Sequence, residues 1–331
     1  MGAKRERRPG EFALIAKYFQ PLARESGAFS LLDDAALYRA SPGTESVITL
    51  DTIAAGVHFA ADDPPDQVAR KALRVNLSDL AAKGARPVEY LLSLALPQDW
   101  TEEWVARFAK GLAADQRAYG ITLVGGDTTR ASGGLTITVT AIGEVPKGKM
   151  VLRSGAKPGD VIFVSGTIGD AALGLAVRRR DLDVTDPKVS ARLEKRYLLP
   201  QPRVALAPVL RRYANSALDV SDGLVGDLAH ICDVSRVGAE IMAGKVPLSS
   251  AAKAVAASSD AALKIILTGG DDYEILATVA AAKADKFARE AAEVGVRVSR
   301  IGEIVGRRHG MVVLGHDGMP IELDQVGHTH F

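Results

Sequence analysis

Aspartates recur through this 331-residue chain at the ends of short apolar segments or beside Gly and Ser. They stand at Asp33-Asp34, Asp51, Asp79, Asp127, Asp219, Asp222 and Asp271-Asp272. Carboxylates brought together from distant parts of a chain repel one another unless cations lie between them. Mg²⁺ is the usual cation for such hard oxygen ligands where nucleotide phosphates also bind. The first hypothesis from the pattern is therefore Mg²⁺-dependent phosphoryl transfer.

The chain is longer than one ordinary hydrophobic core supports, so we expect two α/β domains or one large one. The formal net charge of +1 gives no electrostatic footprint for nucleic acid, which favours a small-molecule ligand. The sequence has no run of 18 apolar residues, so we predict a soluble, cytoplasmic protein without a membrane span. The basic segment 1–10 is expected to be a disordered tail, with a nucleic-acid arm as the alternative.

A polar, turn-rich segment from Arg153 to Asp160 divides the chain. We place the domain boundary near residue 150, with an N-terminal domain over 11–150 and a C-terminal domain over 151–331. In each half a Ser-Asp pair precedes a Gly-Gly-Asp at similar spacing, which is weak evidence for a duplication.

Most of the aspartates follow predicted strands. The predicted strands are 47–50 before Asp51, 121–124 before Gly125-Gly126-Asp127, 217–220 before Ser221-Asp222-Gly223, and 263–267 before Gly269-Gly270-Asp271-Asp272. Asp79 instead lies in a predicted helix over 68–82. Asn76 and Ser78 stand beside it in an Ala-rich helix, which favours a partly buried polar site over a solvated face.

A Gly-Gly-Asp sequence lets the backbone approach a phosphate closely and then presents a carboxylate to a bridging cation. One copy alone would be explained better by a tight turn with a capping Asp. Two copies among several strand-end acids favour the phosphate site. The helix expected after Ser221-Asp222-Gly223 would provide an anion site at its N-terminus, although a simple capped turn is a fair alternative.

Several common enzyme motifs are missing from the sequence. Without G-x-x-x-x-G-K-[ST], G-x-G-x-x-G, or H-R-D with D-F-G, neither a P-loop enzyme, a Rossmann dehydrogenase nor a protein kinase fits. No C-x-x-C or H-E-x-x-H suggests zinc. The lone Cys232 is expected to be a small buried helix residue, with a thiol nucleophile as the minor alternative. His58 follows Asp51 in a Gly-Val-His-Phe loop that is well placed to contact a phosphate or an aromatic substrate, although a lone His is more often structural.

Longer motifs point to one family. They are Gly10-Glu11-Phe12, Asp33-Asp34-Ala35-Ala36, Gly56-Val57-His58-Phe59, Asn76-Leu77-Ser78-Asp79-Leu80-Ala81-Ala82, Gly125-Gly126-Asp127-Thr128-Thr129, Arg153-Ser154-Gly155-Ala156-Lys157-Pro158-Gly159-Asp160, Asp219-Val220-Ser221-Asp222-Gly223-Leu224 and Gly269-Gly270-Asp271-Asp272-Tyr273-Glu274. In order and spacing, over nearly the whole chain, this set resembles the thiamine-monophosphate kinases. The shorter elements also resemble the wider aminoimidazole ribonucleotide synthetase superfamily.

The resemblance implies a two-domain α/β (α+β) fold of the aminoimidazole ribonucleotide synthetase type, with N-terminal strands that pair across a homodimer. It implies ATP as co-substrate, several Mg²⁺ ions, and thiamine phosphate as acceptor. Carried over residue by residue, it implies Mg²⁺ ligands at Asp34, Thr49, Leu50, Asp51, Asp79, Asp127, Asp219 and Asp222. It implies ATP contacts at Gly126, Asp127, Arg153 and Ser221, and acceptor contacts at His58, Asp271 and Phe331.

Two positions depart from the family pattern. Leu32 stands where a Gly usually precedes the Asp-Asp pair, so this loop cannot use a conformation reserved for glycine. His328 replaces an aromatic residue near the C-terminus, which leaves Phe331 as the expected face for the thiamine ring, with a frayed chain end as the alternative.

The hypothesis from the sequence is ATP-dependent phosphorylation of thiamine phosphate to thiamine diphosphate. The alternatives are another ATP-dependent enzyme of the superfamily, of aminoimidazole ribonucleotide synthetase or hydrogenase-maturation type, and a non-catalytic nucleotide-binding protein. Homodimerisation is also predicted from apolar alternation in two segments, 92–96 and 135–139, because unpartnered strands of that kind would present a sticky edge.

Overall fold

The computed structural model describes residues 8–257 and 260–323. The chain forms two compact units, of which unit 1 comprises Met1–Asn76 and Pro87–Glu144, and unit 2 comprises Leu77–Arg86 and Val145–Phe331. Among the described helices, none combines the length and the apolar character that a membrane span requires.

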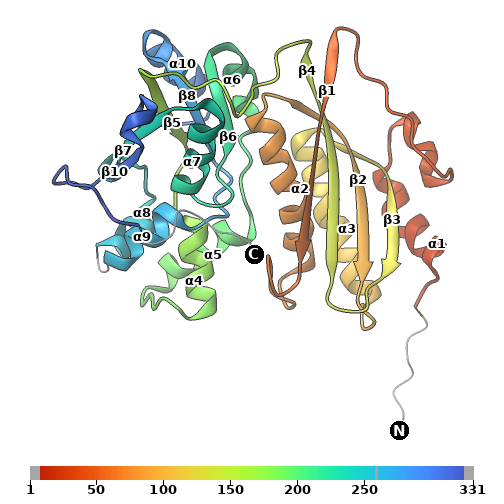
Figure 1. The fold of residues 1–331 in the computed structure, drawn as a ribbon. Helices are drawn as coiled ribbons and strands as arrows, with labels where there is room; N and C mark the ends of the chain where they lie inside the picture. Colours follow the sequence, from red (N-terminus) through yellow and green to blue (C-terminus); the bar gives the residue numbers. More distant parts are fainter. Residues whose placement is uncertain (1–7, 258–259, 324–331) are drawn as a thin grey trace. The chain divides into compact units, whose positions relative to one another are not determined.

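Unit 1 is built on a four-stranded sheet in the order β1-β4-β2-β3, and helices α2 and α3 cover one of its faces (Figure 1). Its elements are α1 (Glu11–Leu14), β1 (Thr44–Ala54), α2 (Pro65–Ala82), β2 (Arg86–Leu96), α3 (Glu102–Tyr119), β3 (Thr122–Arg130) and β4 (Thr136–Pro146), although α2 from Leu77 onward is counted in unit 2. The Thr101 side chain caps α3 by accepting a hydrogen bond from Trp104 N at 3.1 Å, and Gly120 ends the helix in a left-handed conformation. The predicted helix over 68–82 is confirmed by α2.

The core of unit 1 lies between the sheet and these helices. Val105, Phe108 and Leu112 of α3 are fully buried, as their helical spacing predicts. The six alternating residues from which dimerisation was predicted are also buried within this chain: Leu92, Leu94, Leu96, Leu135, Ile137 and Val139. That argument for a dimer is wrong, because these side chains belong to the intramolecular core. The exposed apolar residues of the sheet are instead Ile48 and Leu50 on β1, at 64% and 59%.

Unit 2 is built on a six-stranded sheet in the order β10-β7-β9-β5-β8-β6. Its strands are β5 (Asp160–Ser165), β6 (Ala214–Asp219), β7 (Gly238–Met242), β8 (Ile275–Ala280), β9 (Val298–Val305) and β10 (Met311–Leu314). Its helices are α4 (Asp170–Arg179), α5 (Pro187–Leu198), α6 (Ala207–Tyr213), α7 (Leu224–Ser235), α8 (Ser250–Ala256), α9 (Asp260–Thr268) and α10 (Ala284–Glu293).

Helices pack on both faces of the sheet in unit 2 (Figure 1). Successive strand residues point to opposite faces. On β5, Ile162 and Val164 join the cluster formed with α4, α7 and α9, whereas Phe163 between them joins the cluster formed with α6 and α10. The strands are therefore apolar on both faces, which suits a sheet that is covered on both sides.

Three predicted strand ends differ from the structure. Asp51 lies inside β1, which continues to Ala54, and Gly125-Gly126-Asp127 lies inside β3 rather than after it. The apolar run 263–267 is the end of helix α9 and not a strand. A short apolar run gives no period by which a buried strand can be distinguished from a buried helix, which explains the last error.

A buried ion pair joins α2 to α3 in unit 1. Asp115 is fully buried, and its carboxylate accepts hydrogen bonds from Arg74 Nε at 2.6 Å and from Arg70 Nε at 3.0 Å. Arg74 is itself buried, whereas Arg70 is partly exposed. The acid therefore has counter-charges that offset the cost of removing it from water.

Asp115→Ala is expected to lower the free energy of unfolding by about 3 kcal/mol, because it leaves a buried guanidinium without its counter-charge. Denaturant titration followed by circular dichroism measures this change. Asp66→Ala is the matched control, because Asp66 pairs with Arg107 on the surface, and its loss should cost less than about 1 kcal/mol. Equal effects of the two substitutions would contradict a special role for the buried pair.

Candidate active site

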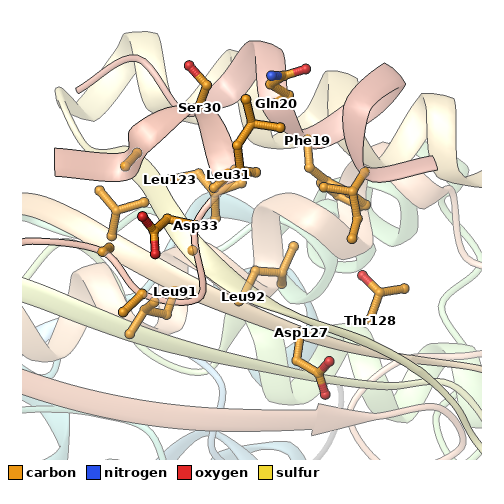
Figure 2. Close-up of a pocket in the computed structure, with 18 of the residues that line it drawn as sticks. Phe19, Gln20, Ser30, Leu31, Asp33, Leu91, Leu92, Leu123, Asp127 and Thr128 are labelled. Carbon is orange, nitrogen blue, oxygen red and sulfur yellow. The ribbon is translucent and has the colours of Figure 1, made fainter. Parts of the chain in front are cut away.

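A cavity of about 730 Å³ lies in unit 1 between the N-terminal segment and the sheet. Figure 2 shows Asp33 and Asp127 among the side chains around it. Its floor includes Leu91 and Ser93 of β2, and its walls include Phe12 and Phe19. Of the predicted site residues, the cavity lining contains Asp34, Gly126 and Asp127. The cavity thus combines an apolar wall with carboxylates, the composition typical of a ligand pocket.

Glycine is required where β3 crosses the floor of this cavity. Strands β2 and β3 are parallel, and their register shifts at Tyr90/Leu91, just before Leu92 pairs with Gly126. Gly126 has φ of 154°, and a Cβ there would collide with the backbone carbonyl of Leu92. The backbone can therefore lie close to its neighbour only without a side chain, and Asp127 follows directly as an exposed residue.

The Asp33-Asp34 loop reaches the cavity by an unusual backbone path. Phe29, Ser30 and Leu31 have φ of 46°, 57° and 56°, a conformation that costs non-glycine residues energy. Leu32 itself has φ of −105°, which any residue adopts, but the prediction that the loop avoids conformations that favour glycine does not hold for the three residues before it. The three strained residues place Asp33 and Asp34 at the cavity, and Asp34 N donates to Asp33 Oδ1 at 2.8 Å.

Thr49, Leu50 and Asp51 lie on β1 and are not in the cavity lining. His58 follows in the turn after β1, also outside that lining. Its Nδ1 accepts a hydrogen bond from Ala54 N at 3.1 Å, which places the ring proton on Nε2. Its carbonyl accepts from Lys71 Nζ at 2.9 Å. His58 therefore has a structural function in closing the turn, and its Nε2 is not used for that function.

Three predicted site residues of unit 2 surround Lys83. The pKa of Lys83 is lowered overall, mainly because the side chain is buried. The nearby carboxylates of Asp219 and Asp79 partly offset this effect, and the positive charge of Arg153 adds to it. The Lys83 ammonium donates to the carbonyl of Ala217 at 2.8 Å. Asp79, Arg153 and Asp219 thus lie within electrostatic range of one cation, so α2, β6 and the segment before β5 meet at this point of unit 2.

The Ser-Asp loop, defined as residues 219–223, is held by an acid that the sequence did not reveal. Asp227 of α7 is buried, and its Oδ2 accepts hydrogen bonds from the backbone N–H groups of Ser221, Asp222 and Gly223 at 3.0, 3.0 and 3.2 Å. Burial raises the pKa of Asp227 to about 7. The capped turn given as the alternative is present, because an internal carboxyl group accepts from the three residues before α7.

The Gly-Asp loop, defined as residues 269–274, separates its two aspartates. Asp272 is fully buried and accepts hydrogen bonds from Gly169 N at 2.7 Å and Ala171 N at 3.4 Å, at the start of α4. Burial raises its pKa well above the usual range. Asp271 is partly exposed with φ of 69°. Only Asp271 is therefore placed to meet a ligand, whereas Asp272 holds the loop.

Magnesium fits the donor set of the predicted ligands, which are carboxylates, a hydroxyl and a backbone carbonyl without His or Cys. In the part of the chain that the structure describes, no three His, Cys, Asp or Glu side chains are grouped closely enough to hold a metal alone. The buried Oδ1 of Asn76 has no hydrogen-bond partner among these residues. Phe331 lies outside the described residues.

A thiol nucleophile is excluded by the position of Cys232. The residue is buried in α7, as predicted, and burial raises the pKa of its thiol to about 11. Because only the thiolate is nucleophilic, a group with this pKa is inert near neutral pH.

Comparison with known proteins identifies the family. Residues 32–145 match the N-terminal domain of the AIR synthase related proteins, and residues 157–315 match the C-terminal domain. The thiamine-monophosphate kinase of Caulobacter vibrioides is 42% identical over 320 residues, covering 95% of this chain and 90% of that protein.

Two solved structures agree. A thiamine-monophosphate kinase from Stenotrophomonas maltophilia superposes with a TM-score of 0.83 at 40% identity, covering 94% of this chain and 98% of that one. AaThiL, in complex with AMPPCP and TMP, superposes with a TM-score of 0.76 at 32% identity, covering 88% and 89%. With both domains matched and relatives aligned over nearly its full length, the chain belongs to the thiamine-monophosphate kinases of the AIR synthase related family.

Proposed function

We propose that the protein transfers the γ-phosphoryl group of ATP to thiamine phosphate, forming thiamine diphosphate and ADP. The observation that carries the proposal is family membership over nearly the whole chain, at 42% identity to a thiamine-monophosphate kinase. The related AaThiL binds AMPPCP, an ATP analogue, together with TMP. The cavity of unit 1 supports the proposal, because Asp127 and Asp34 in its lining are carboxylates of the kind a nucleotide–metal site needs.

Roles are assigned to each unit separately. In unit 1 we assign Gly126 and Asp127 to ATP and His58 to the acceptor; in unit 2 we assign Arg153 and Ser221 to ATP and Asp271 to the acceptor. Phe331 is assigned to the acceptor from the family resemblance alone. The proposed Mg²⁺ ligands are Asp34, Thr49, Leu50 through its carbonyl, Asp51 and Asp127 in unit 1, and Asp79, Asp219 and Asp222 in unit 2.

The proposed Mg²⁺ ligands do not need to form a closed cage of side chains. Mg²⁺ keeps several waters and binds through one or two carboxylates plus substrate phosphates, rather than in a closed cage of side chains. When bound, it would neutralise the charge of the phosphates and orient them. The absence of a three-acid cluster among the described residues is therefore compatible with Mg²⁺ arriving together with ATP.

The acceptor needs no enzymic base. A phosphate monoester has its second pKa at about 6, so its terminal oxygen is already largely ionised near neutral pH and can attack the γ-phosphorus in line. The protein then contributes by binding and orientation. His58 fits a binding role, because its Nδ1 is occupied by Ala54 N–H and its turn is braced by Lys71. The site is accordingly rich in Asp and poor in His.

The proposal includes a homodimer and a cytoplasmic location. Ile48 and Leu50 support the dimer, because two large apolar side chains on β1, an edge strand of the sheet, are more than half exposed. The cytoplasm is the compartment where ATP is made and where a buried, unpaired Cys232 remains reduced.

Incubation with Mg²⁺, ATP and thiamine phosphate, followed by chromatography for thiamine diphosphate and ADP, tests the function directly. Thiamine without its phosphate is the matched control and should give no thiamine diphosphate, because it offers a neutral hydroxyl group in place of an ionised phosphate oxygen. ADP formed only with a carbonyl or amide substrate would identify another enzyme of the superfamily. Binding of ATP without any turnover would identify a non-catalytic nucleotide-binding protein.

Asp127→Asn is expected to lower kcat at least about 100-fold while the fold is retained, because it removes ligand charge from a strand position that Asn can occupy. Steady-state kinetics and circular dichroism measure the two effects. Asp62→Asn makes the same change at an exposed aspartate outside the cavity lining and should leave kcat unchanged. Near-wild-type turnover of Asp127→Asn at saturating Mg²⁺ would remove Asp127 from the site.

Two substitutions at His58 separate its structural and acceptor roles. His58→Asn keeps an acceptor near the position of Nδ1 for Ala54 N–H but removes Nε2, so the KM for thiamine phosphate should rise about tenfold or more, while ATP binding changes little. His58→Gln places a polar atom near Nε2 but loses the Nδ1 contact. Calorimetric titration of each ligand distinguishes the outcomes. Equal weakening of both ligands by His58→Asn would show that the turn supports the whole site.

The wild-type protein is expected to sediment at twice 34.9 kDa at micromolar concentration. Ile48→Glu places a charge on the exposed apolar face of β1 and should shift the protein to the monomer, because burying an unpaired carboxylate is costly. Analytical ultracentrifugation gives the mass. Glu45→Gln, on the same strand, is the control and should remain dimeric. A monomeric wild type would contradict the proposed dimer.

A further inference from the structure

The Ser-Asp loop and the Gly-Asp loop are bonded to each other through their backbones. Asp271 N donates to Ser221 O, and Tyr273 N donates to Val220 O, each at 2.8 Å. Val220 N donates in return to Glu274 O, also at 2.8 Å. The two loops are also in close contact at Gly270, where a Cβ would collide with the carbonyl of Ser221. Neither loop can therefore move far without breaking hydrogen bonds to the other.

Buried acidic side chains also hold each loop in place through hydrogen bonds. On the Ser-Asp loop, the Asp227 carboxyl group gathers three successive backbone N–H groups. On the Gly-Asp loop, Asp272 accepts from the first turn of α4. Two residues on, the fully buried Glu274 accepts from Ser165 Oγ at 2.6 Å and from Arg203 Nε at 2.6 Å.

The backbone of the Gly-Asp loop needs such support. Asp271 and Tyr273 have φ of 69° and 51°, a left-handed conformation that is unfavourable for residues with a side chain. Asp272 between them is the residue whose side chain points into the core. Its contacts with Gly169 and Ala171 therefore hold the strained conformation of both neighbours. Without these contacts, the partly exposed Asp271 would lose its fixed direction.

We propose that Asp227 and Asp272 are positioning residues that make the two loops one preformed body, so that each acid orients the partner loop as well as its own. Because the roles of the loops follow from the proposed function, this inference rests on it. ATP is assigned to the Ser-Asp loop and the acceptor to the Gly-Asp loop. The consequence is specific: weakening the anchor of one loop should impair the ligand assigned to the other.

Asp227→Ala and Asp227→Asn form the first test. Alanine removes the acceptor of three N–H groups, whereas asparagine retains an oxygen for them. We expect Asp227→Ala to raise the KM for thiamine phosphate about tenfold besides raising that for ATP, and Asp227→Asn to restore both to within about threefold of wild type. Circular dichroism and thermal melting establish that each variant is folded.

Hydrogen–deuterium exchange provides a readout that does not depend on activity. Asp227→Ala should accelerate amide exchange in residues 269–274, and Asp272→Asn, which keeps one acceptor oxygen and loses the other, should accelerate exchange in residues 219–223. Asp271→Asn is the control, because it changes the same loop without touching the buried anchor. It should weaken thiamine phosphate alone and leave exchange in 219–223 unchanged.

Three results would overturn the proposal. One is exchange in 269–274 that stays at the wild-type rate in folded Asp227→Ala. Another is a rise in KM for ATP alone in Asp227→Ala, with the KM for thiamine phosphate unchanged. The third is an Asp227→Asn variant as impaired as Asp227→Ala. If wild-type protein forms no thiamine diphosphate, the proposed function fails instead, and the exchange measurements still decide whether the loops are coupled.

Discussion

Buried carboxyl groups determine the shape of the loops in unit 2. Removing a carboxylate from water costs several kcal/mol unless donors surround it. Asp227 has three backbone N–H groups and Glu274 has two arginines, yet burial still raises the pKa of Asp227 to about 7. Each acid is stable only in the conformation that brings all its donors together. The loops are consequently fixed before any ligand binds, which lowers the entropy cost of binding.

The Gly-Gly-Asp sequence occurs in two different structures. In unit 1 it lies within β3, where Gly126 permits close contact with β2 and Asp127 faces out. In unit 2 it follows helix α9 and forms an irregular loop, where Gly270 permits contact with Ser221. The shared property is close approach of two backbones, followed by a carboxylate that is exposed at Asp127 and partly exposed at Asp271. A short motif therefore specifies a local contact and not a secondary structure, which is why the similar spacing in the two halves did not predict similar folds.

The sequence predicted what depends on local pattern and missed what depends on tertiary context. The helix around Leu77 followed from its 3.6-residue period, and the burial of Cys232 agrees with the expectation of a small buried helix residue. The sequence could not predict what covers the alternating leucines of β2. Alternation shows that one face of the strand is apolar, but not whether a helix of the same chain or a second subunit packs on it. Asp227 gave no signal either, since an aspartate in a helix looks solvated until its three backbone partners are known.

The contacts of Asp227 also explain why unit 2 offers carboxylates rather than backbone N–H groups to a ligand. A helix N-terminus normally attracts phosphate. Here an internal carboxyl group accepts from the N–H groups of residues 221–223, just before the helix, so these three groups are not available to a ligand. The remaining functional groups of the loop include the side chains of Asp219 and Asp222, which favour cations. Under the proposed function, such carboxylates would bind a phosphate through a metal ion, which would also reduce the repulsion between the acceptor oxygen and the γ-phosphate.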